Sequence, residues 1–161
     1  MQNIFSISDL VVPNLWPVYI SISFLSTSKC LIFYFSVALL SNRVHGSGTI
    51  ILFNVHHSYG ITNSTLSNFK STGKFVCEKE GLYLIASNII SNKSGSWFKI
   101  MKNQEELSRT YIAQFGSGAS WHSGTGIVVV TLQIMDTIYI VAGGIIGSSS
   151  HENTLIIIKI K

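Results

Sequence analysis

Charged residues are scarce in this chain of 161 residues, because Asp, Glu, Lys and Arg together make up 11% of it, against a usual share of about a quarter. Hydrophobic residues make up 47%. This balance excludes an intrinsically disordered chain, which needs low hydrophobicity and high charge. Ser, Thr, Asn and Gly must therefore cover much of the surface, as in a secreted β-rich protein, or extra apolar surface is buried between subunits.

Basic runs and cysteine are also scarce. The net charge of +4 comes from basic residues spread along the chain, so no basic stripe can neutralise a row of phosphates and nucleic-acid binding is not expected. The cysteines, Cys30 and Cys77, cannot form a disulfide framework, and no Cys-x-x-Cys pair predicts a zinc site. Cys77 lies in an apolar run and is expected to be buried as a small hydrophobe. A Cys30–Cys77 bridge would require that the N-terminal leader stay attached.

Residues 1–32 are expected to form a leader separate from the rest of the chain. No charged residue lies between Leu10 and Ser28, although two prolines interrupt the apolar run. A secretory signal cleaved after Ser28, a membrane anchor of about twenty residues and an atypical extension all fit this composition. Asp9 and the lack of Lys or Arg before the run argue against a signal peptide. Membrane contact is expected only if the leader is an uncleaved anchor.

Residues 33–161 show the pattern of one all-β domain. Runs rich in Ile, Val, Phe, Tyr and Thr recur at short spacing between clusters of Gly, Ser and Asn, and no helical period lasts longer than two turns. About ten short antiparallel strands without helices predict a sandwich or barrel. The expected strands are Phe33–Leu40, Thr49–Asn54, Leu66–Phe69, Lys74–Cys77, Gly81–Ser91, Ser96–Lys102, Leu107–Phe115, Gly124–Gln133, Thr137–Ala142 and Thr154–Lys161.

Tight connections separate several of these strands. Ser71-Thr72-Gly73 and Glu78-Lys79-Glu80-Gly81 are expected to turn sharply, with glycine supplying a positive φ where one is needed. Lys102-Asn103-Gln104-Glu105 predicts a hairpin turn, in which Asn103 tolerates the left-handed conformation.

Two expected strands are apolar on both faces, at Ile127–Val130 and at Leu155–Ile158. A sandwich buries only one face of each strand, so apolar and polar residues should alternate. Because large exposed apolar patches are rare on monomers, a subunit interface is the simplest cover for the outer face. The sequence therefore predicts self-association.

The residues from Phe33 to Lys161 resemble the complement C1q globular domain. The segment Phe75–Tyr83, with the sequence FVCEKEGLY, looks like the Phe-x5-Gly-x-Tyr core of that family. Met135 stands in place of the glycine of the family's Gly-Asp turn. The other matching segments are 33–39, 51–54, 71–75, 100–107 and 123–136.

The resemblance implies a secreted jelly-roll β-sandwich that forms a homotrimer and displays its loops outward. Phe53, Phe75, Gly81 and Tyr83 are expected to be structural, since a glycine that opens a strand permits close backbone approach and a buried tyrosine needs a partner for its hydroxyl. No collagen-like Gly-X-Y stretch precedes the domain in this sequence. A head-only recognition protein is therefore expected, not a stalked complement component.

No common catalytic or metal-binding arrangement occurs in the sequence. His56 and His57 are neighbours in a strand-to-loop region, and since neighbouring strand residues face opposite ways, only one could point into a given site. His151-Glu152 lacks the second histidine of a zinc-protease helix. The glycine-rich segments 116–118 and 124–126 are not followed by Lys-Ser or Lys-Thr and a helix. No enzyme activity, metal site or cofactor is expected, and whether calcium binds is left open.

Aromatic and basic residues near strand ends are the candidates for ligand binding. Trp97, Tyr111, Trp121 and His122 lie in such positions, where aromatic rings can stack on sugars or anchor protein contacts. The alternative is that Trp97 and Tyr111 pack in the core or between subunits.

The expected function is that of a secreted, non-enzymatic recognition module of innate immunity, a homotrimer that binds glycans or microbial surface molecules. Two N-glycosylation sequons, at Asn63 and Asn92, fall in expected loops and fit an extracellular location. Two other functions fit the same fold. One is a signalling ligand of the tumour-necrosis-factor type with a protein receptor, and the other is an extracellular structural protein that assembles with itself.

Overall fold

The computed structural model describes residues 33–39, 46–112, 121–144, 146 and 153–161. In these residues the chain forms a five-stranded sheet in the order β2-β1-β9-β4-β7 and a four-stranded sheet in the order β3-β8-β5-β6. All the strand pairs are antiparallel. The elements are β1 (Phe33–Leu39), β2 (Phe53–Tyr59), α1 (Asn63–Thr72), β3 (Phe75–Val76), β4 (Gly81–Ser91), β5 (Trp97–Lys102), β6 (Glu105–Tyr111), β7 (His122–Leu132), β8 (Thr137–Ala142) and β9 (Thr154–Lys159).

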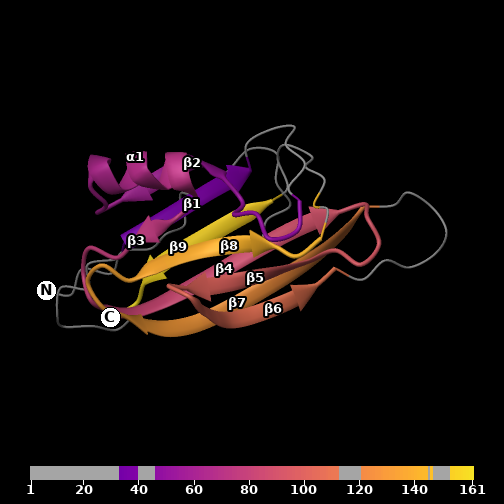
Figure 1. Cartoon of the computed structure of the whole chain (residues 1–161). Helices are drawn as coiled ribbons and strands as arrows, with labels where there is room; N and C mark the ends of the chain where they lie inside the picture. The colour runs from indigo at the N-terminus through magenta and orange to yellow at the C-terminus, as the bar shows by residue number, and fades with distance from the viewer. Residues whose placement is uncertain (1–32, 40–45, 113–120, 145, 147–152) are drawn as a thin grey trace, which may run out of the picture.

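The two sheets lie face to face as the layers of a sandwich (Figure 1), so the expected all-β jelly-roll is confirmed. Side chains alternate between the core and the outside along each strand. On β4, Tyr83, Ile85 and Ile89 are buried, whereas Leu84 and Ala86 are partly exposed. Full burial of a large apolar side chain contributes about 1.5–3 kcal/mol. The largest fully buried side chains are Phe53, Phe69, Phe98, Ile51, Ile85, Ile89, Ile100, Leu132, Ile138 and Ile140.

The expected strand at Leu66–Phe69 is wrong, because these residues belong to helix α1. The side chain of Thr62 caps the N-terminus by accepting a hydrogen bond from the N–H of Thr65, and Gly73, with a φ of 72°, donates its N–H to the carbonyl of Phe69 at 2.7 Å. Within α1 only Thr65 and Phe69 are buried. That buried stripe is too short to show as an apolar helical period, and the two caps are the signal that identifies the helix.

Helix α1 closes one side of the sandwich, since it contacts β2 and β3, which are edge strands of the two sheets (Figure 1). Glu78, in the segment that follows β3, forms hydrogen bonds with Thr62 at the N-terminal end of the helix. Its carboxylate accepts hydrogen bonds from the backbone N–H of Thr62, at 3.3 Å, and from the Thr62 hydroxyl. Burial alone would raise the pKa of Glu78, but these hydrogen bonds lower it. The negative charge also suits the N-terminal end of a helix.

Several strands start or end at other residues than the sequence predicts. The pairing of β2 begins at Phe53 instead of Thr49, and Ile50 makes only an isolated bridge to Val141. Strand β6 begins at Glu105, directly after its turn. The leader predicted for residues 1–32, with Cys30, lies outside the described residues.

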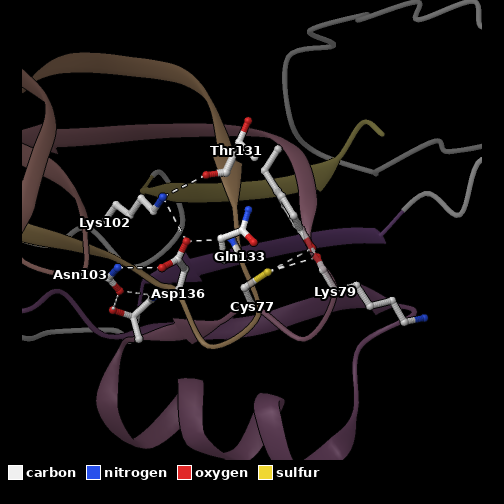
Figure 2. Close-up of polar contacts among 9 residues, drawn as sticks. Cys77, Lys79, Lys102, Asn103, Thr131, Gln133 and Asp136 are labelled. Carbon is white, nitrogen blue, oxygen red and sulfur yellow. Dashed lines mark hydrogen bonds and ion pairs between the residues drawn. The ribbon is translucent and has the colours of Figure 1, made fainter.

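A network of hydrogen bonds joins the β5–β6 turn to the β7–β8 turn (Figure 2). Asn103 has a φ of 54°, so the predicted left-handed residue is confirmed. Its amide donates to Asp136 Oδ1 at 2.8 Å, and its side-chain oxygen accepts from the N–H of Thr137 at 2.9 Å. Asp136 also accepts from the N–H of Gln133 at 2.8 Å and from Lys102 Nζ at 3.0 Å. These contacts, chiefly the Gln133 N–H, hold the pKa of Asp136 at about 2.

The Gly-x-Tyr segment at the start of β4 is placed by the C-terminal residues. A Cβ at Gly81, whose φ is 150°, would lie 2.0 Å from the carbonyl oxygen of Lys161, so a side chain has no room there. The buried Tyr83 donates its hydroxyl to the carbonyl of Lys79 at 2.6 Å, and burial raises its pKa. Cys77 is buried, as expected, and its Sγ donates to the same carbonyl at 3.2 Å (Figure 2).

Met135 lies in the β7–β8 turn with a φ of 71° and a side chain that is 72% exposed. The left-handed conformation costs a non-glycine residue about 1–2 kcal/mol, and glycine costs about 0.5–1 kcal/mol in backbone entropy. We therefore expect Met135→Gly to raise the free energy of unfolding by about 0.5–1 kcal/mol, measured by urea denaturation.

The matched control for that substitution is Asn103→Gly, at the other non-glycine residue with a positive φ among those described. It removes the side-chain hydrogen bonds to Asp136 and Thr137, so it should lower the free energy of unfolding by about 1 kcal/mol. If Met135→Gly were also destabilising, the strain assigned to Met135 would be absent.

Candidate functional site

Two of the predicted binding residues meet on the outer face of the four-stranded sheet. Trp97 begins β5 and Tyr111 ends β6, and the register pairs them directly. Their ring centroids are 6.2 Å apart and the rings are inclined at 45°. Phe98 and Ile100 alternate with the outward residues of β5 and are fully buried. Trp97 and Tyr111 therefore lie on the outer surface of the sheet and not in the core.

Two cations approach the ring of Trp97. The guanidinium carbon of Arg109 lies 4.5 Å from the ring centroid, and Lys99 Nζ lies 5.3 Å from it. Both distances are within the range of cation–π attraction. Arg109 Nη1 also donates to the Tyr111 hydroxyl at 3.5 Å.

The carboxylate of Glu106 forms ion pairs with both Arg109 and Lys99. Arg109 donates from Nε and from Nη2 to the two carboxylate oxygens, each at 2.9 Å, and Lys99 Nζ lies 2.6 Å from Oε2. The hydrogen bonds from Arg109 and Lys99 hold the pKa of Glu106 at about 2, so the carboxylate stays charged at neutral pH. We call Trp97, Lys99, Glu106, Arg109 and Tyr111 the aromatic cluster.

An irregularity in the β5–β6 ladder brings Glu106 to this face. The register shifts between Ile100 and Met101, so that Met101 pairs with Glu106 while Lys99 pairs with Arg109. An extra residue in one strand reverses the side on which the following side chains point. Glu106 is thereby placed on the same side as Lys99 and Arg109.

Gly143 supports Trp97 from the end of β8. A Cβ at residue 143 would lie 1.9 Å from the indole ring, so the ring rests against the backbone there, and the N–H of Gly143 donates to the carbonyl of Trp97 at 2.8 Å. Trp97 is consequently half-buried, whereas Tyr111 is 65% exposed. The groups that the cluster presents to a ligand are the Tyr111 ring and the Arg109 guanidinium.

The other two predicted binding residues belong to the other sheet. His122 is the first residue of β7 and pairs with Ser91, and Trp121, which precedes it, is 47% exposed. The four predicted residues are therefore divided between the two sheets. Sequence reasoning missed Lys99, Glu106 and Arg109. Lys99 alternates with Trp97, and Arg109 alternates with Tyr111, on the two strands of a predicted hairpin, which is the only signal for these two residues. Glu106 has no such signal, because the register shift brings it to this face.

The remaining candidates from the sequence are not members of the aromatic cluster. Asn63, expected in a loop, is instead the first residue of α1 and is exposed, and Asn92 lies in the β4–β5 connection. His57 is exposed on β2. Residues 116–118 and His151-Glu152 lie outside the described residues. In the part of the chain that the structure describes, no three His, Cys, Asp or Glu side chains could hold a metal ion, and no helix has the length and hydropathy to span a membrane.

A second surface of interest is the outer face of the five-stranded sheet. Ile127 and Val129 of β7 are 62% and 57% exposed. The register places Ala86 and Ile156 in line with Ile127, and Leu84 and Ile158 in line with Val129. We call these residues the apolar face: Leu84, Ala86, Ile127, Val129, Ile156 and Ile158.

The topology and the core define a jelly-roll sandwich whose two outer faces differ in chemistry. The family model of the C1q domain matches residues 34–156. The chain therefore belongs to the C1q domain family. C1q/TNF-like domains typically form trimers. Proteins of the C1q domain family are typically extracellular and are generally non-enzymatic recognition or ligand modules.

Solved structures of two kinds share the fold. The globular domain of zebrafish complement 1qA is 18% identical, with a TM-score of 0.57, and the match covers 78% of this chain and 94% of that one. A crystal structure of murine APRIL, at pH 8.0, is 12% identical, with a TM-score of 0.60, and the match covers 80% of this chain and 98% of that one. A sequence comparison with curated proteins finds no match.

The support of Trp97 by Gly143 can be tested by Gly143→Ala. The added methyl group overlaps the indole ring, so the ring must move, and we expect the free energy of unfolding to fall by about 1–3 kcal/mol in urea denaturation. Gly144→Ala is the matched control, since a Cβ there lies no closer than 3.1 Å to its nearest neighbour. Equal stability of the two variants would show that Trp97 does not rest on Gly143.

Proposed function

We propose that the protein is a secreted, non-enzymatic recognition module of innate immunity, which binds glycans of microbial surfaces through the aromatic cluster and assembles as a homotrimer through the apolar face. The observation that carries the proposal is the contrast between the two outer faces of the sandwich. One face presents exposed Ile127 and Val129, and the other presents exposed Tyr111 beside paired charges. The first chemistry suits burial against another copy of the chain, and the second suits a polar ligand.

The apolar face supports self-association. Its side chains lie in two rows across β7, β4 and β9, and two of them are more than half exposed in a single chain. Contiguous apolar surface of this kind is uncommon on monomers and marks an interface. A head-to-tail contact that closes after three copies would cover the face in every subunit, in keeping with the trimers typical of the family.

The aromatic cluster supports glycan binding. An exposed tyrosine ring offers an apolar surface with a polar tip, and the neighbouring Arg109 is a planar donor of several hydrogen bonds. The cluster lies on the four-stranded sheet and the apolar face on the five-stranded sheet, and these sheets are the two layers of the sandwich (Figure 1). A neighbour that covers the apolar face therefore leaves the cluster open. Three copies in one assembly would add avidity for a surface that repeats the same glycan.

A second candidate function is that of a ligand for a protein receptor. The similarity to murine APRIL, at a TM-score of 0.60, favours it as a tumour-necrosis-factor-like alternative. An exposed Tyr-Arg pair can also anchor a protein contact. Binding to isolated glycans separates the two functions, because a receptor ligand of this kind would need no glycan contact.

The role of the apolar face is tested by Ile127→Lys in the full chain. A lysine in each copy of a closed interface places unpaired charges in an apolar contact, so we expect sedimentation velocity to show a monomer where the unsubstituted chain is a trimer. Ile134→Lys is the matched control, because Ile134 is 60% exposed but lies in the β7–β8 turn. A trimer that survives Ile127→Lys and not Ile134→Lys would place the interface elsewhere.

Glycan binding is tested on an array of immobilised glycans with Tyr111→Ala. We expect reproducible binding that free glycan competes away, and a loss of about tenfold in affinity when the Tyr111 ring is removed, which corresponds to about 1.4 kcal/mol. Tyr59→Ala is the matched control, since Tyr59 is 68% exposed on β2. Binding that falls equally in both variants would remove the aromatic cluster from the proposal, and no binding at all would favour the receptor ligand.

A further inference from the structure

We infer that the aromatic cluster takes a saccharide that carries a carboxylate, and that Glu106 occupies the two cations of the cluster until this ligand displaces it. The inference rests on the proposed function and names the chemical class of its ligand. It follows from the contacts of Glu106 within the cluster and from the position of Tyr111 beside them.

The geometry around Glu106 is that of a carboxylate-binding site already filled. Arg109 binds both oxygens in a fork, with two contacts of 2.9 Å, and Lys99 adds a third contact at 2.6 Å. A planar guanidinium recognises any carboxylate in this two-bond arrangement. The carboxylate of a bound sugar can make the same contacts once the Glu106 side chain has turned away.

The exchange is feasible because the ion pairs are open to water. The side chains of Lys99, Glu106 and Arg109 are 23%, 33% and 37% exposed. Ion pairs at such exposure add little net stability, so replacing one carboxylate by another changes the stability of the fold only slightly. The two cations and one carboxylate leave a net positive charge at the cluster, which attracts an anion.

The cations keep their positions without Glu106. The ring of Trp97 lies 4.5 Å from the guanidinium of Arg109 and 5.3 Å from Lys99 Nζ, and the backbone of Gly143 holds that ring in turn. Cation–π contacts therefore hold both charged groups over the indole when the carboxylate leaves. This support makes the cluster a preformed anion site.

Tyr111 supplies the part of the site that contacts the sugar ring. Its ring is 65% exposed, and its hydroxyl lies 3.5 Å from Arg109 Nη1. In an acidic sugar the carboxylate is attached directly to the ring, so one residue of the saccharide can contact the cations and Tyr111 together. A neutral sugar contacts Tyr111 only and leaves the cations bound to Glu106.

The test uses the full chain and a glycan array printed in two forms, as native carboxylated glycans and as their methyl esters. We expect the bound glycans to be carboxylated ones, and esterification to weaken binding by about tenfold or more. Glu106→Gln should raise the affinity for the acids by about three- to tenfold, because it frees Arg109 and Lys99, and it should leave the esters unchanged. Glu105→Gln removes the same charge from the adjacent residue and should have a smaller effect on the acids.

Each contrary outcome has a distinct meaning. If esters bind as tightly as acids, the inferred ligand class is wrong while the proposed function stands. If Glu106→Gln has no effect, or if Glu105→Gln raises affinity equally, Glu106 does not occupy the ligand's place. If no glycan of either form binds, the proposed function itself fails. Equal urea midpoints for the two variants and the unsubstituted chain establish that binding, and not folding, is compared.

Discussion

A sandwich of two sheets can bury only one face of each sheet, and the remaining features of this molecule depend on how the chain meets that constraint. The inner face is a continuous core, to which β4 gives Tyr83, Ile85 and Ile89. Helix α1 closes the side at β2 and β3, with Phe69 fully buried. The core is thus packed from apolar side chains. The exposed apolar residues and the ion pairs considered next lie on the two outer faces.

The two outer faces have opposite chemistry, and each suggests its own partner. On the five-stranded sheet, Ile127 and Val129 stand exposed over apolar neighbours, which favours a second copy of the chain. On the four-stranded sheet, Arg109 and Lys99 converge on Glu106 beside an exposed Tyr111, which favours a polar and anionic ligand. Because the faces lie on opposite layers, a partner bound to one face does not cover the other.

The sequence predicts the features that depend on local pattern, namely the alternation of the strands and the turn at Asn103. The sequence pattern does not predict helix α1, because its buried stripe consists of Thr65 and Phe69 alone, although the capping residues Thr62 and Gly73 are present. The aromatic cluster depends on the register shift between β5 and β6. If the pairing continued from the turn without that shift, Trp97 would pair with Thr110, and Tyr111 would point to the other face of the sheet. Residue types therefore suggest Trp97 and Tyr111, but their ionic partners require the actual register.

The exposed apolar face of the five-stranded sheet is proposed to be covered by other copies of the chain. Sedimentation equilibrium of the unsubstituted full chain over a series of dilutions tests it most directly. We expect a single species with three times the mass of one chain, which dissociates only at high dilution. A stable monomer at every concentration would contradict it.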